Sequence, residues 1–163
     1  MNRIYLAENL KIKAATAIDF GVVYKKLKLW LEDHGFADER TLEKKYIERI
    51  KPNGKQLEID WHAEKPKSDF FTYNIDLTFL IIGMNDIEVQ QGAIKRKLNK
   101  GDYELRLTAY ISASKNLEKL GPLKRIYVNM LTKKRIEEYK KDLYDKFYKF
   151  HAYIKELLNL RNY

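Results

Sequence analysis

Apolar and polar residues alternate along the middle of the chain, between residues 46 and 113. The alternation is clearest in three runs, at residues 57–64, 71–81 and 103–111. A helix with this pattern would have no single apolar face, whereas a strand would bury one side and expose the other. Residues that tolerate turn dihedrals divide the region at Pro52-Asn53-Gly54, Pro66-Lys67-Ser68-Asp69, Asn85-Asp86, Gln91-Gly92 and Asn99-Lys100-Gly101-Asp102. Because such short connections make neighbouring strands antiparallel, the pattern predicts a meander of five or six strands.

The segment before the meander predicts a strand followed by a helix. Residues 10–15 alternate in hydrophobicity, which indicates a short strand at the edge of a sheet. Thr16 is a candidate N-cap with Asp19 three residues later, and the apolar residues that follow recur at helical spacing. Gly35 supplies a residue that readily adopts the left-handed conformation at which helices end, so we expect a helix over residues 17–34.

The segment after Ser114 predicts helices. A short helix is expected over residues 123–130, and Thr132 is the candidate N-cap of a second helix. In this second helix, apolar residues repeat at spacings of three and four: Ile136, Tyr139, Leu143, Phe147, Phe150, Ile154 and Leu157. The spacing predicts one long amphipathic helix whose apolar stripe packs against the apolar face of the sheet.

Together these elements predict an α+β fold, in which an antiparallel meander of five to seven strands packs against a long C-terminal helix. The length of 163 residues suits one domain: residues 10–113 would form the N-terminal helix and the sheet, and residues 122–159 the C-terminal helical cover. The element order resembles the helix-grip arrangement of START-like and Bet v 1-like domains. That resemblance implies a curved sheet around the long helix and an apolar cavity between them, and it assigns no functional residue.

The positive charge is concentrated near the C-terminus. The chain has 32 basic and 23 acidic residues, a net charge of +9. Residues 1–41 and 42–114 each have a net charge of +1, whereas residues 115–163 have 13 basic and 6 acidic residues. The polar face of the predicted sheet carries Glu58, Asp60, Glu64, Asp76 and Glu104, so RNA is not expected to bind there. A polyanion would instead meet the helical region.

This charge distribution leads to the hypothesis of a non-enzymatic binding protein that associates with nucleic acid (RNA or DNA) or a ribonucleoprotein through phosphate contacts. The alternative interpretation is that the basic residues only form the solvated face of a helix. The candidate nucleic-acid-binding residues are basic side chains, together with two tyrosines that could stack on bases: Lys124, Arg125, Lys133, Lys134, Arg135, Lys140, Lys141, Tyr144, Tyr148, Lys149, Lys95, Arg96 and Lys97.

Residues suited to catalysis or metal binding form no motif. The chain has no Cys, and its seven Gly form neither of the common nucleotide-binding loops. His34, His62 and His151 lie on different predicted elements, and carboxylates on the same strand face as His62 are spaced nearly 7 Å apart along the strand. Asp60 and Asp76 share a polar face where neither would be desolvated. We therefore expect no enzyme activity, no metal and no cofactor.

Two further functions remain as alternatives. One is a START-like module that binds a small apolar ligand between the sheet and the C-terminal helix. The other is a structural subunit that contacts a protein partner or a second copy through exposed tyrosines. Most aromatic residues fall at core positions, but four lie off the core stripes and are expected at the surface: Tyr110, Tyr144, Tyr148 and Tyr163.

The sequence predicts a cytoplasmic protein without a membrane span. An acidic residue at position 8 precedes any apolar segment of a secretory signal, and the longest strongly apolar run covers only residues 79–84, against about 20 residues needed to cross a bilayer. A basic amphipathic helix can also lie on anionic lipid, but a sheet that needs a cover explains the apolar stripe better.

Overall fold

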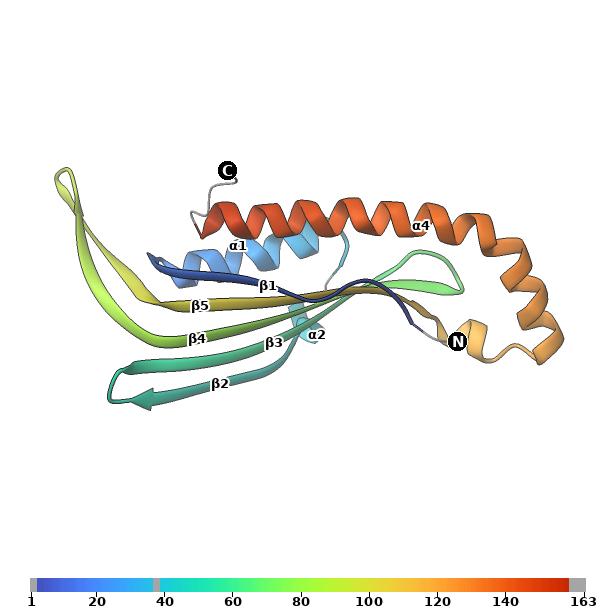
Figure 1. Ribbon diagram of the computed structural model, residues 1–163, viewed down its shortest axis with the longest axis horizontal. Helices are drawn as coiled ribbons and strands as arrows, with labels where there is room; N and C mark the ends of the chain where they lie inside the picture. Colours follow the sequence, from blue (N-terminus) through green and yellow to red (C-terminus); the bar gives the residue numbers. More distant parts are fainter. Residues whose placement is uncertain (1–2, 37–38, 159–163) are drawn as a thin grey trace.

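A five-stranded antiparallel sheet forms one layer of the molecule (Figure 1). The computed structural model describes residues 3–36 and 39–158, and for residues 39 and 40 it describes the backbone only. The strands are β1 (Ile4–Ile18), β2 (Glu43–Lys51), β3 (Gly54–Pro66), β4 (Phe71–Gln91) and β5 (Ile94–Ala113). Their order across the sheet is β1-β5-β4-β3-β2, so the first strand pairs with the last strand of the meander. The predicted fold class is confirmed.

Two helices cover one face of the sheet (Figure 1). They are α1 (Phe20–Asp33) and the long C-terminal helix α4 (Pro122–Leu157), and the short helices α2 (Glu39–Leu42) and α3 (Lys115–Glu118) lie in connections. The odd-numbered residues of β3 and β4 point towards α1 and α4, and most of them are buried. Among the described helices, none is both long and apolar enough to span a membrane.

The core lies between the sheet and the second part of α4. Leu143, Phe147, Phe150 and Ile154 are completely buried and belong to the same cluster as the apolar residues of the strands. The ring of Trp30 on α1 contacts Phe150, with centroids 4.7 Å apart. The predicted apolar stripe of the last helix is therefore confirmed, and its side chains occupy the space between sheet and helix.

The first helix begins and ends close to the predicted positions. Its N-cap is Asp19, whose carboxylate accepts a hydrogen bond from the amide of Val22 at 3.3 Å. Thr16 is not the cap, because β1 continues to Ile18. Gly35 adopts a φ of +77°, and the chain reverses there. The prediction of a glycine-terminated helix is confirmed, and its start moves to Phe20.

Two of the predicted turns are wrong, because Asn85-Asp86 and Asn99–Asp102 lie inside β4 and β5. Gly83 has a φ of +64°, and the pairing of β4 with β5 shifts register between Ile82 and Asn85. A bulge of this kind bends paired strands without ending them. The residues that resemble turns therefore lie where the ribbon of β4 and β5 curls away from the sheet (Figure 1).

The separate short helix expected over residues 123–130 is also wrong, because it is the first part of α4. Thr132, the predicted N-cap, lies within the helix, and its hydroxyl donates to the carbonyl of Val128 at 2.7 Å. A threonine bonded in this way can bend a helix, and α4 does bend over its first turns (Figure 1). The described chain thus ends in one 36-residue helix.

Candidate binding surface

The long helix α4 consists of two parts that contact the rest of the protein differently. We call residues 122–135 the arm and residues 136–157 the packed half. All completely buried residues of α4 lie in the packed half. The arm extends beyond the end of the sheet, and only its inner side, with Val128, lies against the core cluster (Figure 1).

The packed half is fixed to the sheet by polar contacts as well as by burial. The hydroxyl of Tyr73 on β4 donates to the carboxylate of Asp142 at 3.0 Å, and Lys67 and Lys146 form ion pairs with the same carboxylate. Burial alone would raise the pKa of Asp142, but the hydrogen bonds from Lys146 and Tyr73 outweigh burial and hold this pKa below its ordinary value. The ionised carboxylate thus holds α4 at the point where it crosses β4.

The outer side of the arm is apolar and exposed to solvent. Five large side chains are more than half exposed: Leu123 at 84%, Met130 at 73%, Tyr127 at 64%, Leu131 at 62% and Ile126 at 57%. At about 100° per residue, these five positions form one continuous arc about 140° wide around the helix axis. Large exposed apolar patches are uncommon on soluble proteins and mark interaction sites. Nothing in the described part of the chain covers this arc.

The arm also carries all of the net charge of α4. Its charged residues are Lys124, Arg125, Lys133, Lys134 and Arg135, with no acidic residue among them. The packed half has five basic and five acidic residues, so its net charge is zero. None of the arm cations forms an ion pair with a described acidic side chain. The net positive charge of the predicted basic surface on α4 is therefore concentrated in the arm.

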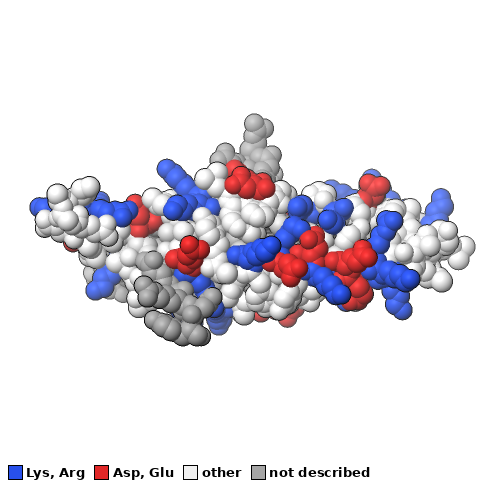
Figure 2. Space-filling model, turned by 90° about the horizontal axis from the view of Figure 1, so that it is seen from above, with Lys and Arg blue, Asp and Glu red and all other residues white. Residues whose placement is uncertain are grey.

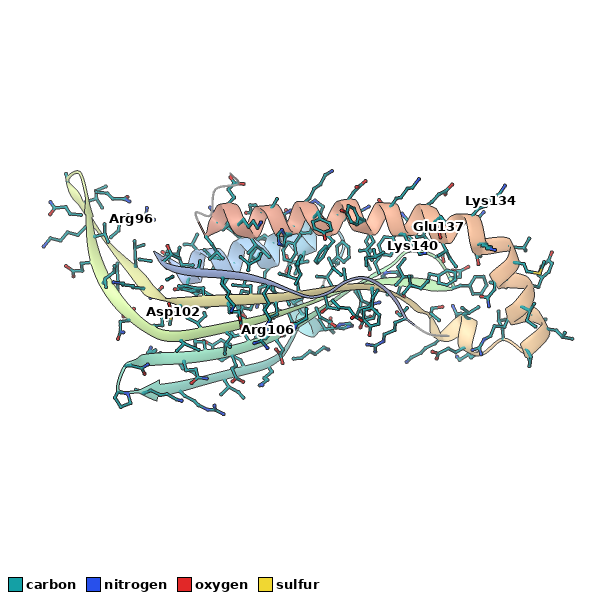
Figure 3. All side chains as sticks on the ribbon, in the orientation of Figure 1. Arg96, Asp102, Arg106, Lys134, Glu137 and Lys140 are labelled. Carbon is teal, nitrogen blue, oxygen red and sulfur yellow. The ribbon has the colours of Figure 1, made fainter. Side chains whose placement is uncertain are left out.

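One of the three candidate lysines in the packed half is paired with a carboxylate. Lys140 forms an ion pair with Glu137 at 3.0 Å (both are labelled in Figure 3), whereas Lys141 and Lys149 pair with no described carboxylate. The rings of Tyr144 and Tyr148 contact each other in a tilted arrangement with centroids 4.5 Å apart, and both are exposed, as predicted. Acidic and basic side chains alternate over α4 when the molecule is seen from above (Figure 2).

The basic cluster of Lys95, Arg96 and Lys97 lies far from the arm. These residues are near the tip of the β4–β5 hairpin, at the opposite end of the molecule from Lys134 (Figure 3). Lys97 forms an ion pair with Asp86 at 3.0 Å. Because neighbouring residues of a strand point to opposite faces, Arg96 faces away from Lys95 and Lys97. The structure does not bring this cluster together with the basic residues of α4.

Comparisons with known proteins were made for the whole chain. No protein-family model, curated protein or solved structure matches it. The interpretation of function therefore depends on the residues and geometry of this chain.

A second polar site lies on the open face of the sheet. His62 contacts the carboxylate of Asp76 through Nδ1 and that of Glu64 through Nε2 at 2.8 Å. The hydrogen bond to Asp76 is the main cause that raises the pKa of His62 above its ordinary value, in spite of burial. Both ring nitrogens are therefore engaged. In the part of the chain that the structure describes, no group of three or more His, Asp or Glu could hold a metal ion.

The other residues of this face clarify two sequence predictions. Asp60 accepts a hydrogen bond from Thr78 at 2.8 Å, whereas Asp76 bonds His62, so the two aspartates do not form a pair. Tyr110 was expected at the surface, but it is only 4% exposed, because Arg3 lies over its ring at 4.6 Å and Tyr5 packs beside it. Tyr163 lies outside the described residues.

The exposed apolar arc of the arm is the feature that the sequence analysis missed. Leu123, Ile126, Tyr127, Met130 and Leu131 have the helical spacing of a buried stripe, and this spacing was visible in the sequence. What the sequence does not contain is the position at which the sheet ends. Beyond that position an apolar stripe has no cover and becomes part of the candidate surface.

Proposed function

We propose that this protein is a non-enzymatic binding protein that attaches to an anionic partner through the arm of α4. The observation that carries the proposal is the asymmetry of α4: the arm has five cations that pair with no described carboxylate and has no acid, whereas the packed half has a net charge of zero. A helix that serves only as a cover for the sheet would need neither this charge nor the exposed apolar arc. A charged and partly apolar surface without a cover within its own chain is typical of an interface.

Nucleic acid, alone or in a ribonucleoprotein, is one anionic partner that fits the cations. Lysine and arginine on an exposed helix can neutralise phosphates without reading base sequence, and such binding weakens steeply with salt. The excess of positive charge on the arm supports Lys124, Arg125, Lys133, Lys134 and Arg135 as the main contacts. The remaining candidates would contribute less, since two of them, Lys97 and Lys140, have carboxylate partners and the packed half has no net charge.

A ligand cavity between the sheet and α4 is the weaker proposal. The helix-grip resemblance implies such a cavity, but the side chains of Leu143, Phe147, Phe150 and Ile154 fill this space and pack against the strands. A ligand bound in this space would have to displace one of these side chains. We therefore propose that binding takes place on the outer surface of the molecule. The proposed location of the protein is the cytoplasm.

Two variants with the same change in net charge test the proposal. The arm variant replaces Lys133, Lys134 and Arg135 with alanine, and the control variant replaces Lys140, Lys141 and Lys149. Binding to mixed-sequence RNA and to phosphatidylserine-containing vesicles is measured by fluorescence anisotropy and by co-sedimentation at 50 mM and 200 mM salt. We expect binding to at least one probe, weakened more than tenfold in the arm variant and less than threefold in the control. Binding to neither probe, or equal loss in both variants, would overturn the proposal.

A further inference from the structure

The apolar arc of the arm favours one kind of anionic partner over others. A polynucleotide presents phosphates, sugars and base edges, and it offers no apolar surface large enough for five aliphatic and aromatic side chains. The headgroup and acyl boundary of a bilayer offers negative charge and apolar contact together. The combination found on the arm is therefore better matched by lipid than by nucleic acid.

Three of the five arm cations lie at the edges of the apolar arc. With about 100° per residue, Lys124 and Arg135 fall along one edge and Lys133 falls along the other. Lys134 lies within the arc, at its end nearer the packed half, and Arg125 lies on the opposite side of the helix with its Nε buried. In an interfacial helix the apolar side enters the acyl boundary, and flanking lysine and arginine side chains reach the phosphates beside it. The positions of Lys124, Lys133 and Arg135 agree with this geometry.

The position and shape of the arm leave it accessible to a flat surface. It forms one end of the long axis of the molecule (Figure 1), and the side chains of its apolar arc are exposed to solvent. A hollow between the arm and the β3–β4 loop is lined by Phe70, Thr132 and Tyr139, and Leu131 and Arg135 border it at one edge of the arc. Lys115, Glu118 and Lys119, just before the arm, are exposed and add a net charge of +1. A protein partner would need a complementary groove, whereas a bilayer adapts to a convex helix.

We propose that the arm binds the surface of anionic membranes, with Leu123, Ile126, Tyr127, Met130 and Leu131 in the headgroup–acyl boundary and Lys124, Lys133, Lys134 and Arg135 on lipid phosphates. This inference rests on the proposed function, because it names the partner of the same surface. It is specific to lipid, because the apolar residues must contribute to binding as well as the charges. The packed half and the sheet remain outside the bilayer.

The test uses full-length protein and vesicles of phosphatidylcholine with or without phosphatidylserine. We expect binding only when phosphatidylserine is present. Replacing Lys133, Lys134 and Arg135 with alanine should weaken it on the order of 100-fold, from about 1 kcal/mol per cation. The apolar variant Leu123→Ser/Met130→Ser should weaken vesicle binding at least tenfold, while a control pair of exposed apolar residues outside α4, Leu29→Ser/Ile50→Ser, should change it less than threefold. Circular dichroism and urea denaturation confirm that each variant is folded.

A tryptophan placed on the arm reports whether the arm enters an apolar environment when vesicles are added. The two native tryptophans are in or against the core, so Tyr127→Trp adds a probe that is exposed in the free protein. Its emission should shift to shorter wavelength with vesicles that contain phosphatidylserine and should not shift with mixed-sequence RNA.

The outcomes separate the inference from the proposed function. If the apolar variant binds vesicles as wild type does, or if RNA binds and vesicles do not, the lipid inference is overturned and the anionic-partner proposal stands. If the apolar variant instead abolishes a dimer seen by light scattering while vesicles remain unbound, the arc is a self-association surface and the lipid inference is overturned. If neither RNA nor vesicles bind, both proposals fail.

Discussion

The two halves of α4 have similar spacing of apolar residues but opposite surroundings. In the packed half four apolar residues, Leu143, Phe147, Phe150 and Ile154, are completely buried, and the charges sum to zero. In the arm five apolar residues are more than half exposed, and all five charges are positive. The comparison shows that amphipathic spacing in one continuous helix can serve two purposes. Where the sheet lies beneath α4, the apolar stripe forms part of the core. Beyond the end of the sheet, the apolar stripe is exposed as a surface.

The largest expected difference between the halves is in stability. Phe147→Ala removes a completely buried side chain and should lower the free energy of unfolding by about 3–5 kcal/mol. Met130→Ala on the exposed arm should change it by less than about 0.5 kcal/mol. Urea denaturation followed by circular dichroism measures both. Losses of similar size would mean that the arm is packed and that the two halves do not differ.

A smaller effect is expected at the polar contact that fixes the packed half. Asp142→Asn weakens the bonds from Tyr73 and Lys146 and should cost about 1 kcal/mol at pH 7, because the carboxylate is partly exposed to solvent. The pKa of Asp142 in the folded protein lies below its ordinary value of 3.8, so this stabilisation is present above pH 3.8 and is lost as the pH falls through the folded-state pKa.

The control for this contact is Asp145→Asn, which removes an exposed carboxylate that forms no ion pair with a described residue and should change stability by less than about 0.5 kcal/mol. A difference between wild type and Asp142→Asn that stays constant from pH 7 to pH 2 would contradict the role of the ionised carboxylate.

The halves should also respond differently to pH. Burial, with a smaller effect of Lys155, lowers the pKa of His151 in the packed half below 6.5, so its protonation should reduce stability as the pH falls through 6.5 towards the folded-state pKa. His62 on the sheet has a raised pKa, and its contribution is present below pH 6.5 and is lost as the pH rises through the folded-state value. The arm contains neither histidine nor carboxylate, so its binding should not follow the titration of either histidine.

Proton NMR titration measures the two histidines directly. The pKa of His151 is expected to lie below 6.5, and the pKa of His62 is expected to lie above it. Equal values near 6.5 for both would show that neither environment is formed in solution. Binding by the arm that follows a histidine titration would show that the surface includes residues outside the arm.

The smallest effect concerns the start of the arm. Gly121 is the N-cap of α4 with φ −63° and ψ 162°, it makes no side-chain cap, and a Cβ there would meet nothing within 4 Å. Gly121→Ser should add a capping hydrogen bond worth a few tenths of a kcal/mol. Amide exchange at residues 123–127 should slow about twofold while global unfolding is unchanged. Slower exchange in the packed half as well would mean that the two halves unfold together.

Much of the fold could be predicted because burial of one side of a strand or helix gives its apolar residues a regular spacing in the sequence. The strands of the meander and the stripe from Leu143 to Ile154 were visible as periods of two and of three to four. The turns expected at Asn85-Asp86 and Asn99–Asp102 were wrong, because Asn and Gly suit a bulge as well as a turn and only the pairing partner decides between them. The burial of Tyr110 under Arg3 likewise depends on a long-range contact.

The candidate surface could be predicted only in part. The excess of cations near the C-terminus was visible by counting, but its restriction to the arm depends on where α4 leaves the sheet. The separation of Arg96 from Lys134 depends on the curled hairpin and on the direction of α4 (Figure 3). Neither the place where α4 leaves the sheet nor the separation of these two residues is a local property of the sequence.

Hydrogen–deuterium exchange of the full-length protein with and without phosphatidylserine vesicles tests the central claim most directly. Peptides covering residues 122–135 should exchange quickly in the free protein and become protected by vesicles. Peptides from the packed half should be protected in both states. Protection at the β4–β5 hairpin or on the open sheet face, with no change in the arm, would contradict the claim that the arm is the contact element.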